Sequence, residues 1–326
     1  MKLISSINTL VLFILSGVLC LSCTSENHKK KIVYINSYHR GHPSSDEIMD
    51  AIIGYFPKDS FNVTSFFMDT KRNSSQDYIV NKANQLYDSI SKINPEILIV
   101  SDDNAVKYII QPNLDKLSIP VVFCGVNGSD REYDLPADKV TGMIEILPVA
   151  ETIMTLRPYY PSMKKLLVLT ENTTTSNKEK ELLDTLFNRV GVSATYALVD
   201  DFETWKSTFE EANQKFDIVY IVTHGAIKGW DHEEAVQFVD QHIQIPVITC
   251  EDFMMPYAVF GMTKVAMEQG IWAAETAKKI MNGSKPNDFP VIRNKLSATW
   301  LNTSLAQKIS FNPDTSLLGN FRIVDQ

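Results

Sequence analysis

Cysteine is scarce in the chain and concentrated near its start. Two of the four cysteines, Cys20 and Cys23, lie within the first 23 of 326 residues, which leaves Cys124 and Cys250 in the body. A chain of this length can bury a sizeable core without disulfides. Cys124 and Cys250 each end an apolar segment in a different half of the chain, so we interpret both as small buried hydrophobic residues.

Long basic runs and the short motifs of common enzymes are also missing. The formal net charge is −8 and the longest Lys/Arg run is Lys29 to Lys31, so a nucleic acid is not an expected partner. The sequence contains no Gly-x-Ser-x-Gly, no Walker phosphate loop and no Gly-x-Gly-x-x-Gly. We therefore expect no catalytic residues, no enzyme and no cofactor, although chemistry assembled from scattered residues stays open.

Two short clusters contain metal-ligand side chains without a recognised metal spacing. His39 and His42 fall in a loop, where no helix aligns them. Residues 231–234, Asp-His-Glu-Glu, open an expected helix, where acidic side chains interact favourably with the helix dipole. We therefore expect no metal site.

The first 22 residues are typical of an export signal. Lys2 supplies a positive start, and residues 10–21 form an apolar stretch too short and too near the terminus for a good membrane span. Ser22 and Cys23 resemble the end of a bacterial lipoprotein signal, which predicts acylation at Cys23 and a polar tether over 23–31. We expect an exported protein anchored in a membrane by lipid and facing the periplasm or cell exterior; a plain secretory signal is the alternative.

The body of the chain alternates between expected strands and helices. Strands are expected at 32–37, 63–67, 97–101, 121–124 and 140–144, and again at 166–170, 194–198, 218–223 and 247–250, with helices between them. The segment Ile-Pro-Val-Val-Phe-Cys-Gly-Val-Asn (119–127) is echoed by Ile-Pro-Val-Ile-Thr-Cys-Glu-Asp (245–252). Such alternation predicts two α/β halves, each a doubly wound parallel sheet with helices on both faces.

The order of these pieces resembles the ABC-transporter substrate-binding protein family, which has the type I periplasmic-binding fold. The similarity is carried by residues 32–38, 97–104, 119–127, 140–142, 156–161, 164–170, 273–286 and 302–306. The resemblance implies two α/β lobes joined by a three-crossing hinge, with a ligand enclosed between them when the lobes close. It also implies a small-molecule solute and an ABC permease as partners, and we expect a monomer.

These considerations divide the chain into a signal peptide (1–22), a tether (23–31), lobe 1 (32–143), lobe 2 (144–253) and a return segment (254–326) that packs mainly on lobe 1. We expect the crossings near 142–146, 252–258 and 297–302, and a long helix over 263–281. No Gly/Ser-rich linker separates the halves, so short crossing strands are favoured over a flexible tether.

Ligands of open α/β sheets bind beyond the carboxyl ends of the strands, and polar residues follow several of the expected strands. A helix start such as that at Ser176 can also hold an anion, although capping of the helix explains the same side chain. The expected ligand-binding residues are Ser37, Tyr38, Asp102, Asn104, Asn127, Thr170, Asn172, Ser176, Asn177, His224 and Glu251.

The sequence leaves the identity of the solute open. The resemblance weakly favours an amino acid or a related carboxylate, because sugar sites usually need more aromatic side chains than the expected cleft offers. The competing interpretation is a ligand-binding sensory module that acts with a separate membrane sensor.

Overall fold

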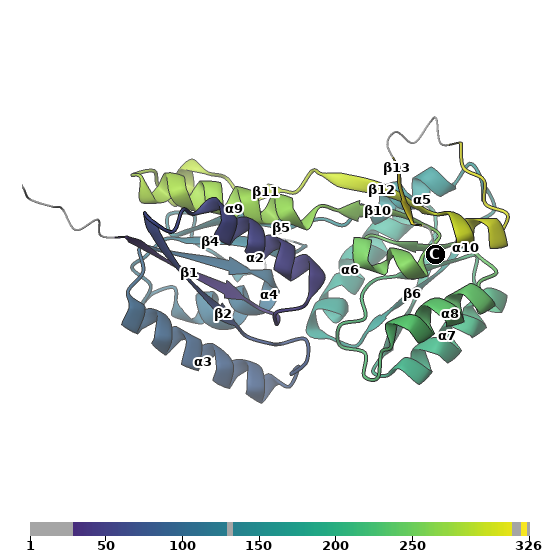
Figure 1. Cartoon of the computed structure of the whole chain (residues 1–326), viewed down its shortest axis with the longest axis horizontal. Coiled ribbons are helices and arrows are strands. Elements are labelled where there is room, and N and C mark those ends of the chain that lie inside the picture. Colours follow the sequence, from purple (N-terminus) through teal and green to yellow (C-terminus); the bar gives the residue numbers. More distant parts are fainter. Residues whose placement is uncertain (1–28, 129–132, 315–320, 325–326) are drawn as a thin grey trace, which may run out of the picture.

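The computed structural model describes residues 29–128, 133–314 and 321–324. The expected signal peptide and the expected lipidation site Cys23 lie outside these residues. Figure 1 shows two lobes side by side, each built around one sheet. The fold class expected from the sequence is therefore confirmed.

The sheet of lobe 1 has the spatial order β11-β5-β4-β3-β1-β2, and all the pairings described are parallel. Its strands are β1 (Lys30–Asn36), β2 (Phe61–Phe67), β3 (Ile97–Ser101), β4 (Val121–Asn127), β5 (Val140–Glu145) and β11 (Ile292–Arg293). Its helices and helical turns are α2 (Pro43–Tyr55), α3 (Gln76–Ile93), α4 (Asp102–Ala105), η1 (Val106–Ile110), η2 (Gln111–Asn113), α9 (Ala266–Met281) and η5 (Pro286–Asp288).

Alternation along β1 explains why helices cover both faces of this sheet. Ile32 and Tyr34 pack into the cluster that contains α2 and α9, whereas Val33 and Ile35 pack into the cluster that contains α3. Successive strand side chains point to opposite faces, so an uninterrupted apolar strand needs cover on both. Both faces of the sheet are consequently buried, and the carboxyl ends of its strands are the part that stays available for a ligand site.

Helix α9 packs closely on α2 because a glycine lies at their contact. A Cβ atom placed on Gly270 would lie 2.4 Å from the carbonyl oxygen of Ile48 and 2.8 Å from the Cβ of Ala51. The absence of a side chain therefore lets the return segment lie against the first helix of lobe 1 (Figure 1).

Lobe 2 has a second sheet in the order β13-β12-β10-β9-β8-β6-β7, in which β10 and β12 pair antiparallel. Its strands are β6 (Lys165–Glu171), β7 (Ser193–Val199), β8 (Ile218–Ile221), β9 (Val247–Thr249), β10 (Phe260–Lys264), β12 (Ser297–Asn302) and β13 (Phe321–Val324). Its helices and turns are α5 (Val149–Leu156), α6 (Thr174–Arg189), α7 (Phe202–Lys215), α8 (His232–His242), η4 (Asp252–Tyr257) and α10 (Thr303–Lys308).

Two expected crossings are misplaced. The chain passes between the sheets after β5, between β10 and α9, and between β11 and β12. Residues 252–258 form η4 within lobe 2, and residues 297–302 are β12 of its sheet, so neither segment crosses. The return segment is also shared, because α9 packs on lobe 1 whereas β10, β12 and β13 extend lobe 2.

The expected helix over 263–281 is wrong at its start. Thr263 and Lys264 belong to β10, which pairs with β9 and β12, and the helix begins at Ala266. At these two residues, pairing with strands that are distant in sequence outweighs the local preference for a helix. The consequence is that Lys264 stands at a strand end, next to a crossing.

Side chains tie the three crossings together. The side-chain amide of Asn294 donates to the carbonyl of Ile146 (3.1 Å) and accepts from its N–H (2.7 Å). The carboxylate of Glu268, in the first turn of α9, accepts from the N–H groups of Lys295 and Leu296. The crossings therefore form one connected hinge.

Candidate functional site

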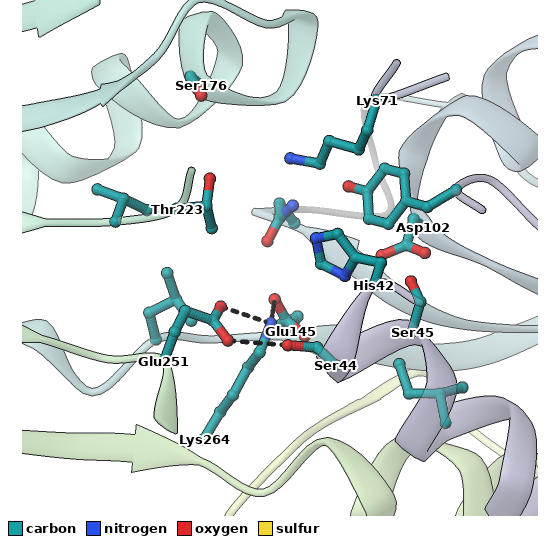
Figure 2. A pocket seen from close by; sticks show the side chains of 15 residues that line it. His42, Ser44, Ser45, Lys71, Asp102, Glu145, Ser176, Thr223, Glu251 and Lys264 are labelled. Atoms are coloured by element: carbon teal, nitrogen blue, oxygen red, sulfur yellow. Dashed lines mark hydrogen bonds and ion pairs between the residues drawn. The ribbon is translucent and has the colours of Figure 1, made fainter. Parts of the chain in front are cut away.

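A cavity lies between the lobes, where the carboxyl ends of both sheets meet (Figure 2). In this arrangement it leaves about 30 Å³ accessible to the centre of a water molecule, within about 510 Å³ of space that is not filled by protein atoms and is partly open to solvent. Lobe 1 contributes Tyr38, His42, Ser44, Ser45, Ile48, Lys71, Asp102, Asn127 and Glu145. Lobe 2 and the crossing that leads to it contribute Leu147, Ser176, Val222, Thr223, Glu251 and Lys264.

One buried ion pair spans the lobes at this cavity. The ammonium of Lys71, in the loop after β2, pairs with the carboxylate of Glu171, the last residue of β6. The other oxygen of Glu171 accepts from the N–H of Ala226 at 2.6 Å. Burial opposes ionisation of Glu171, but Lys71 outweighs it and holds the pKa of that carboxyl below its usual range.

A second buried cluster lies at the hinge. Lys264 contacts Glu145 of lobe 1 at 2.6 Å and Glu251 of lobe 2 at 2.8 Å, and Glu251 also accepts from the hydroxyl of Ser44 at 3.0 Å. Figure 2 shows these side chains converging below the cavity. Burial raises the pKa of Glu251 to about 7, although Lys264 opposes the shift. Burial opposes charge on Lys264 as well, but the two carboxylates raise its pKa.

His42 faces the cavity as a neutral ring. It precedes Pro43 at the start of α2, and its centroid lies 4.9 Å from that of Tyr38 and 5.9 Å from that of Phe253 in lobe 2. Burial, aided by Lys71, lowers the pKa of His42 to about 2. Both ring nitrogens are buried without a hydrogen-bond partner among the described residues, so one donor and one acceptor are open to a ligand.

Asp102 places a carboxyl group in the lobe 1 wall of the cavity. It directly follows β3 and has a φ of 67°, a left-handed conformation that a short polar side chain tolerates. Its Oδ2 atom is buried and has no partner among the described residues. Burial, together with nearby Glu145, raises the pKa of Asp102 to about 8.

Its neighbour Asp103 has a structural role. The carboxylate of Asp103 accepts from the side-chain amide of Asn127 at 3.0 Å and from the hydroxyl of Tyr133 at 2.5 Å. These bonds fix Asn127, at the end of β4, beside the cavity.

Five of the residues expected to bind ligand line the cavity: Tyr38, Asp102, Asn127, Ser176 and Glu251. The other six are not part of the lining, and their polar groups are largely engaged elsewhere. The hydroxyl of Ser37 donates to the carbonyl of Ser101 and accepts from the N–H of Ala105, and the amide of Asn104 donates to Thr70.

The remaining expected residues lie on lobe 2. Asn172 and Asn177 are exposed and hydrogen bond to each other, and Thr170 contacts Ser176. His224 is half-buried and stacks on Trp230 with the ring planes 3° apart. His224 therefore supports the wall of the lobe, and burial lowers its pKa to about 4.

Sequence reasoning missed Lys71, Glu145 and Lys264 and considered His42 only as a metal ligand. Glu145 and Lys264 are the last residues of β5 and β10, and Lys71 lies four residues beyond β2. Asp102 was selected by the rule that polar residues at the carboxyl ends of parallel strands bind ligands. The same rule, applied to β5 and β2, would have found Glu145 and Lys71. Lys264 was hidden by its assignment to a helix.

Within the described ranges, no group of three or more His, Cys, Asp or Glu side chains is placed to hold a metal ion. In the same part of the chain, no helix combines the length and the apolar character needed to cross a membrane. Cys124 and Cys250 are both free and buried, as expected.

The profile of a family described as "ABC transporter substrate binding protein" matches residues 42–320. That range contains fourteen of the fifteen lining residues, all but Tyr38. No curated protein matches the chain significantly.

Several solved structures share the two-lobe fold. A domain from Streptococcus pneumoniae in complex with L-Trp is 16% identical, with a TM-score of 0.70 over 90% of this chain and 100% of that one. A ligand-free, open substrate-binding protein with adhesive properties from Clostridium difficile is 16% identical (TM-score 0.62, 91% and 99% covered). A carbohydrate transporter from Acidothermus cellulolyticus in complex with myo-inositol is 12% identical (TM-score 0.60, 87% and 98% covered).

Proposed function

Since the chain belongs to the ABC transporter substrate-binding protein family, whose members are non-enzymatic, we propose that it is the extracytoplasmic receptor of an ABC importer and captures a small organic solute between its lobes. The observation that carries this proposal is the cavity itself. Side chains from the strand ends of both lobes line it, so a bound solute would contact both lobes and favour closure.

The site we propose consists of the five expected residues that line the cavity together with His42 and Thr223. These side chains present hydroxyl, amide, imidazole and carboxylate groups, whereas Ile48, Leu147 and Val222 supply apolar surface. Only these three of the fifteen lining side chains are apolar, so the wall is more polar than that of most small-molecule sites and suits a polar solute.

The lipid anchor is part of the proposal. Acylation at Cys23 would hold the body at a membrane surface through the tether 23–31, next to a permease. We expect Cys23→Ser to move the protein from the membrane fraction to the soluble fraction, measured by fractionation of the producing cells, whereas Cys124→Ser leaves it in the membrane fraction.

Solute capture is tested by thermal denaturation of residues 24–326 in the presence of amino acids, amines, nucleosides, sugars and short peptides. A solute present at about 100 times its dissociation constant stabilises a protein by about 2.7 kcal/mol, which is enough to move the midpoint by several degrees. The solute found should also compact the protein in small-angle X-ray scattering. Binding without compaction would contradict capture by lobe closure.

The partner decides between import and sensing. We expect the full-length protein, crosslinked in the producing membrane, to co-purify with an ABC permease. Co-purification with a membrane sensor instead would overturn the import proposal and favour the sensory alternative.

A further inference from the structure

We propose that the cavity selects a small solute of net positive charge and binds its ammonium, or a comparable cationic group, on the carboxylate of Asp102. This inference rests on the proposed receptor function and adds the charge class of the solute. It departs from the amino acid or related carboxylate that the resemblance to the family favoured.

The first observation is the open acceptor on Asp102. Its Oδ2 atom lies in the cavity wall, buried and without a donor among the described residues. A buried polar atom without a partner costs free energy, and a carboxylate costs more than a neutral group. In the solute-free protein the raised pKa of Asp102 limits this cost, because the carboxyl stays mostly protonated near pH 7. A ligand that brings an N–H donor and a positive charge displaces that proton and gives the carboxylate its partner.

The second observation is that the cations of the cavity wall are already engaged. Lys71 pairs with Glu171, and Lys264 pairs with both Glu145 and Glu251. A ligand carboxylate would have to compete for one of these ammonium groups and leave a buried carboxylate of the protein without its partner. That exchange is costly in a buried site.

The balance of charge points the same way. Around the cavity the described residues place the carboxyl groups of Asp102, Glu145, Glu171 and Glu251 against the ammonium groups of Lys71 and Lys264. Without a solute, the raised pKa of Asp102 leaves that carboxyl mostly protonated near pH 7. A bound cation takes the place of this proton, a zwitterion brings no net charge to replace it, and an anion adds negative charge beside the other carboxylates.

His42 is compatible with a cation because its ring is neutral. The ring places one N–H donor and one nitrogen acceptor at the cavity, both without partners among the described residues. These groups suit a second polar function on the solute, such as a hydroxyl or a further N–H. A cationic imidazole in the same place would repel the solute.

The experiment measures dissociation constants by titration calorimetry for two triplets that share a skeleton and differ in charge. One triplet is tyramine, tyrosine and 3-(4-hydroxyphenyl)propionate; the other is 3-methylbutylamine, leucine and 4-methylpentanoate. Myo-inositol serves as a neutral polyol. We expect the amine of at least one triplet to bind about 10-fold or more tightly than its amino acid, and the carboxylates to bind least.

Asp102→Asn tests the residue. Asparagine tolerates the left-handed backbone at this position and keeps the shape of the side chain. It should weaken amine binding about 30-fold or more, whereas Asp88→Asn, the same change on the exposed side of α3, should not alter it. If Asp102→Asn fails to fold, the dissociation constants of the two triplets, measured with the unchanged protein, still test the charge class of the solute.

Failure of this inference differs from failure of the receptor function. An amino acid or myo-inositol that binds more tightly than the amines, or amine binding that survives Asp102→Asn, would overturn the charge class and leave solute capture standing. A folded protein that binds no member of either triplet also contradicts the charge class. If it further binds nothing in the wider thermal screen, the receptor function falls with it.

Discussion

At the residue scale, the buried charges at the hinge depend on one another. Lys264→Met would leave Glu145 and Glu251 buried without their cation. We expect a loss of about 3–5 kcal/mol in the free energy of unfolding, measured by denaturant titration. The loss should be smaller at pH 5.5 than at pH 8, because Glu251, whose pKa is already raised to about 7, takes up a proton.

The control for this prediction is Lys308→Met, since Lys308 pairs with Asp240 at 2.9 Å but both side chains are about 40% exposed. An exposed pair contributes about 1 kcal/mol or less. Equal losses in the two variants would mean that the hinge cluster does not stabilise the fold in the way its burial indicates.

Asp102 predicts a pH dependence of stability in the solute-free protein. Its pKa is about 8 when folded and near 3.8 when unfolded, so the folded state binds the extra proton between these values. Protonation of Asp102 therefore stabilises the folded state. This contribution to the free energy of unfolding is complete below about pH 4 and is lost as the pH rises towards 8. The charged groups that face it are Glu145, Lys264, Asp103 and Lys71.

Asp102→Asn should consequently lose less stability than the unchanged protein between pH 5 and pH 8.5, measured by denaturant titration at each pH. Asp88→Asn should retain the original slope. Identical slopes in all three proteins would contradict an unpaired, buried carboxyl at position 102.

At the element scale, α2 and α9 test how tightly the return segment is held. Gly270→Ala places a methyl group against the backbone of Ile48, which cannot move without shifting the helix. We expect a loss of about 1–3 kcal/mol. Gly54→Ala, near the end of α2, meets no atom within 4 Å and should stabilise the protein by about 0.5–1 kcal/mol. Denaturant titration of both variants separates helix packing from helix propensity.

Several elements could be predicted from sequence because their signals are local. The strand expected at 97–101 has those bounds in the structure, and α7 lies where the alternation places a helix, between the strands expected at 194–198 and 218–223. Ser75 and Asp231 cap α3 and α8, with the side chain accepting from a backbone N–H in each case. Apolar periodicity and helix capping depend on residues that are close in the chain, so both signals can be recognised in a single sequence.

The site was less predictable because its charged members are fixed by partners distant in sequence. Lys71 and Glu171 are 100 residues apart, and Lys264 and Glu145 are 119 apart. In the sequence alone, each of these four residues is indistinguishable from a solvated surface charge. The strand-end rule still found Asp102 and Asn127, whereas Asn172 and Asn177, chosen by the same rule, point to solvent and to each other.

At the scale of the whole molecule, the lobes meet through side-chain contacts on more than one side of the cavity. Lys71 and Glu171 join the lobes on one side of the cavity, and Ser44 joins Glu251 on another. The side chains of Lys71 and Glu171 are only 6% and 0% exposed in this arrangement. Closure therefore buries charges that would be solvated in an open form, and their pairing offsets part of that cost.

Lys71→Met should shift the solute-free protein towards an open form. In the closed arrangement the variant buries the carboxylate of Glu171 without its cation, whereas opening returns that carboxylate to water. We expect a larger radius of gyration than that of the unchanged protein, measured by small-angle X-ray scattering without solute. Arg72→Met is the matched control, because Arg72 is exposed and pairs with Asp69 within lobe 1. If the two variants scatter identically, the contacts that hold the lobes together lie elsewhere, and Ser44→Ala becomes the next variant to measure.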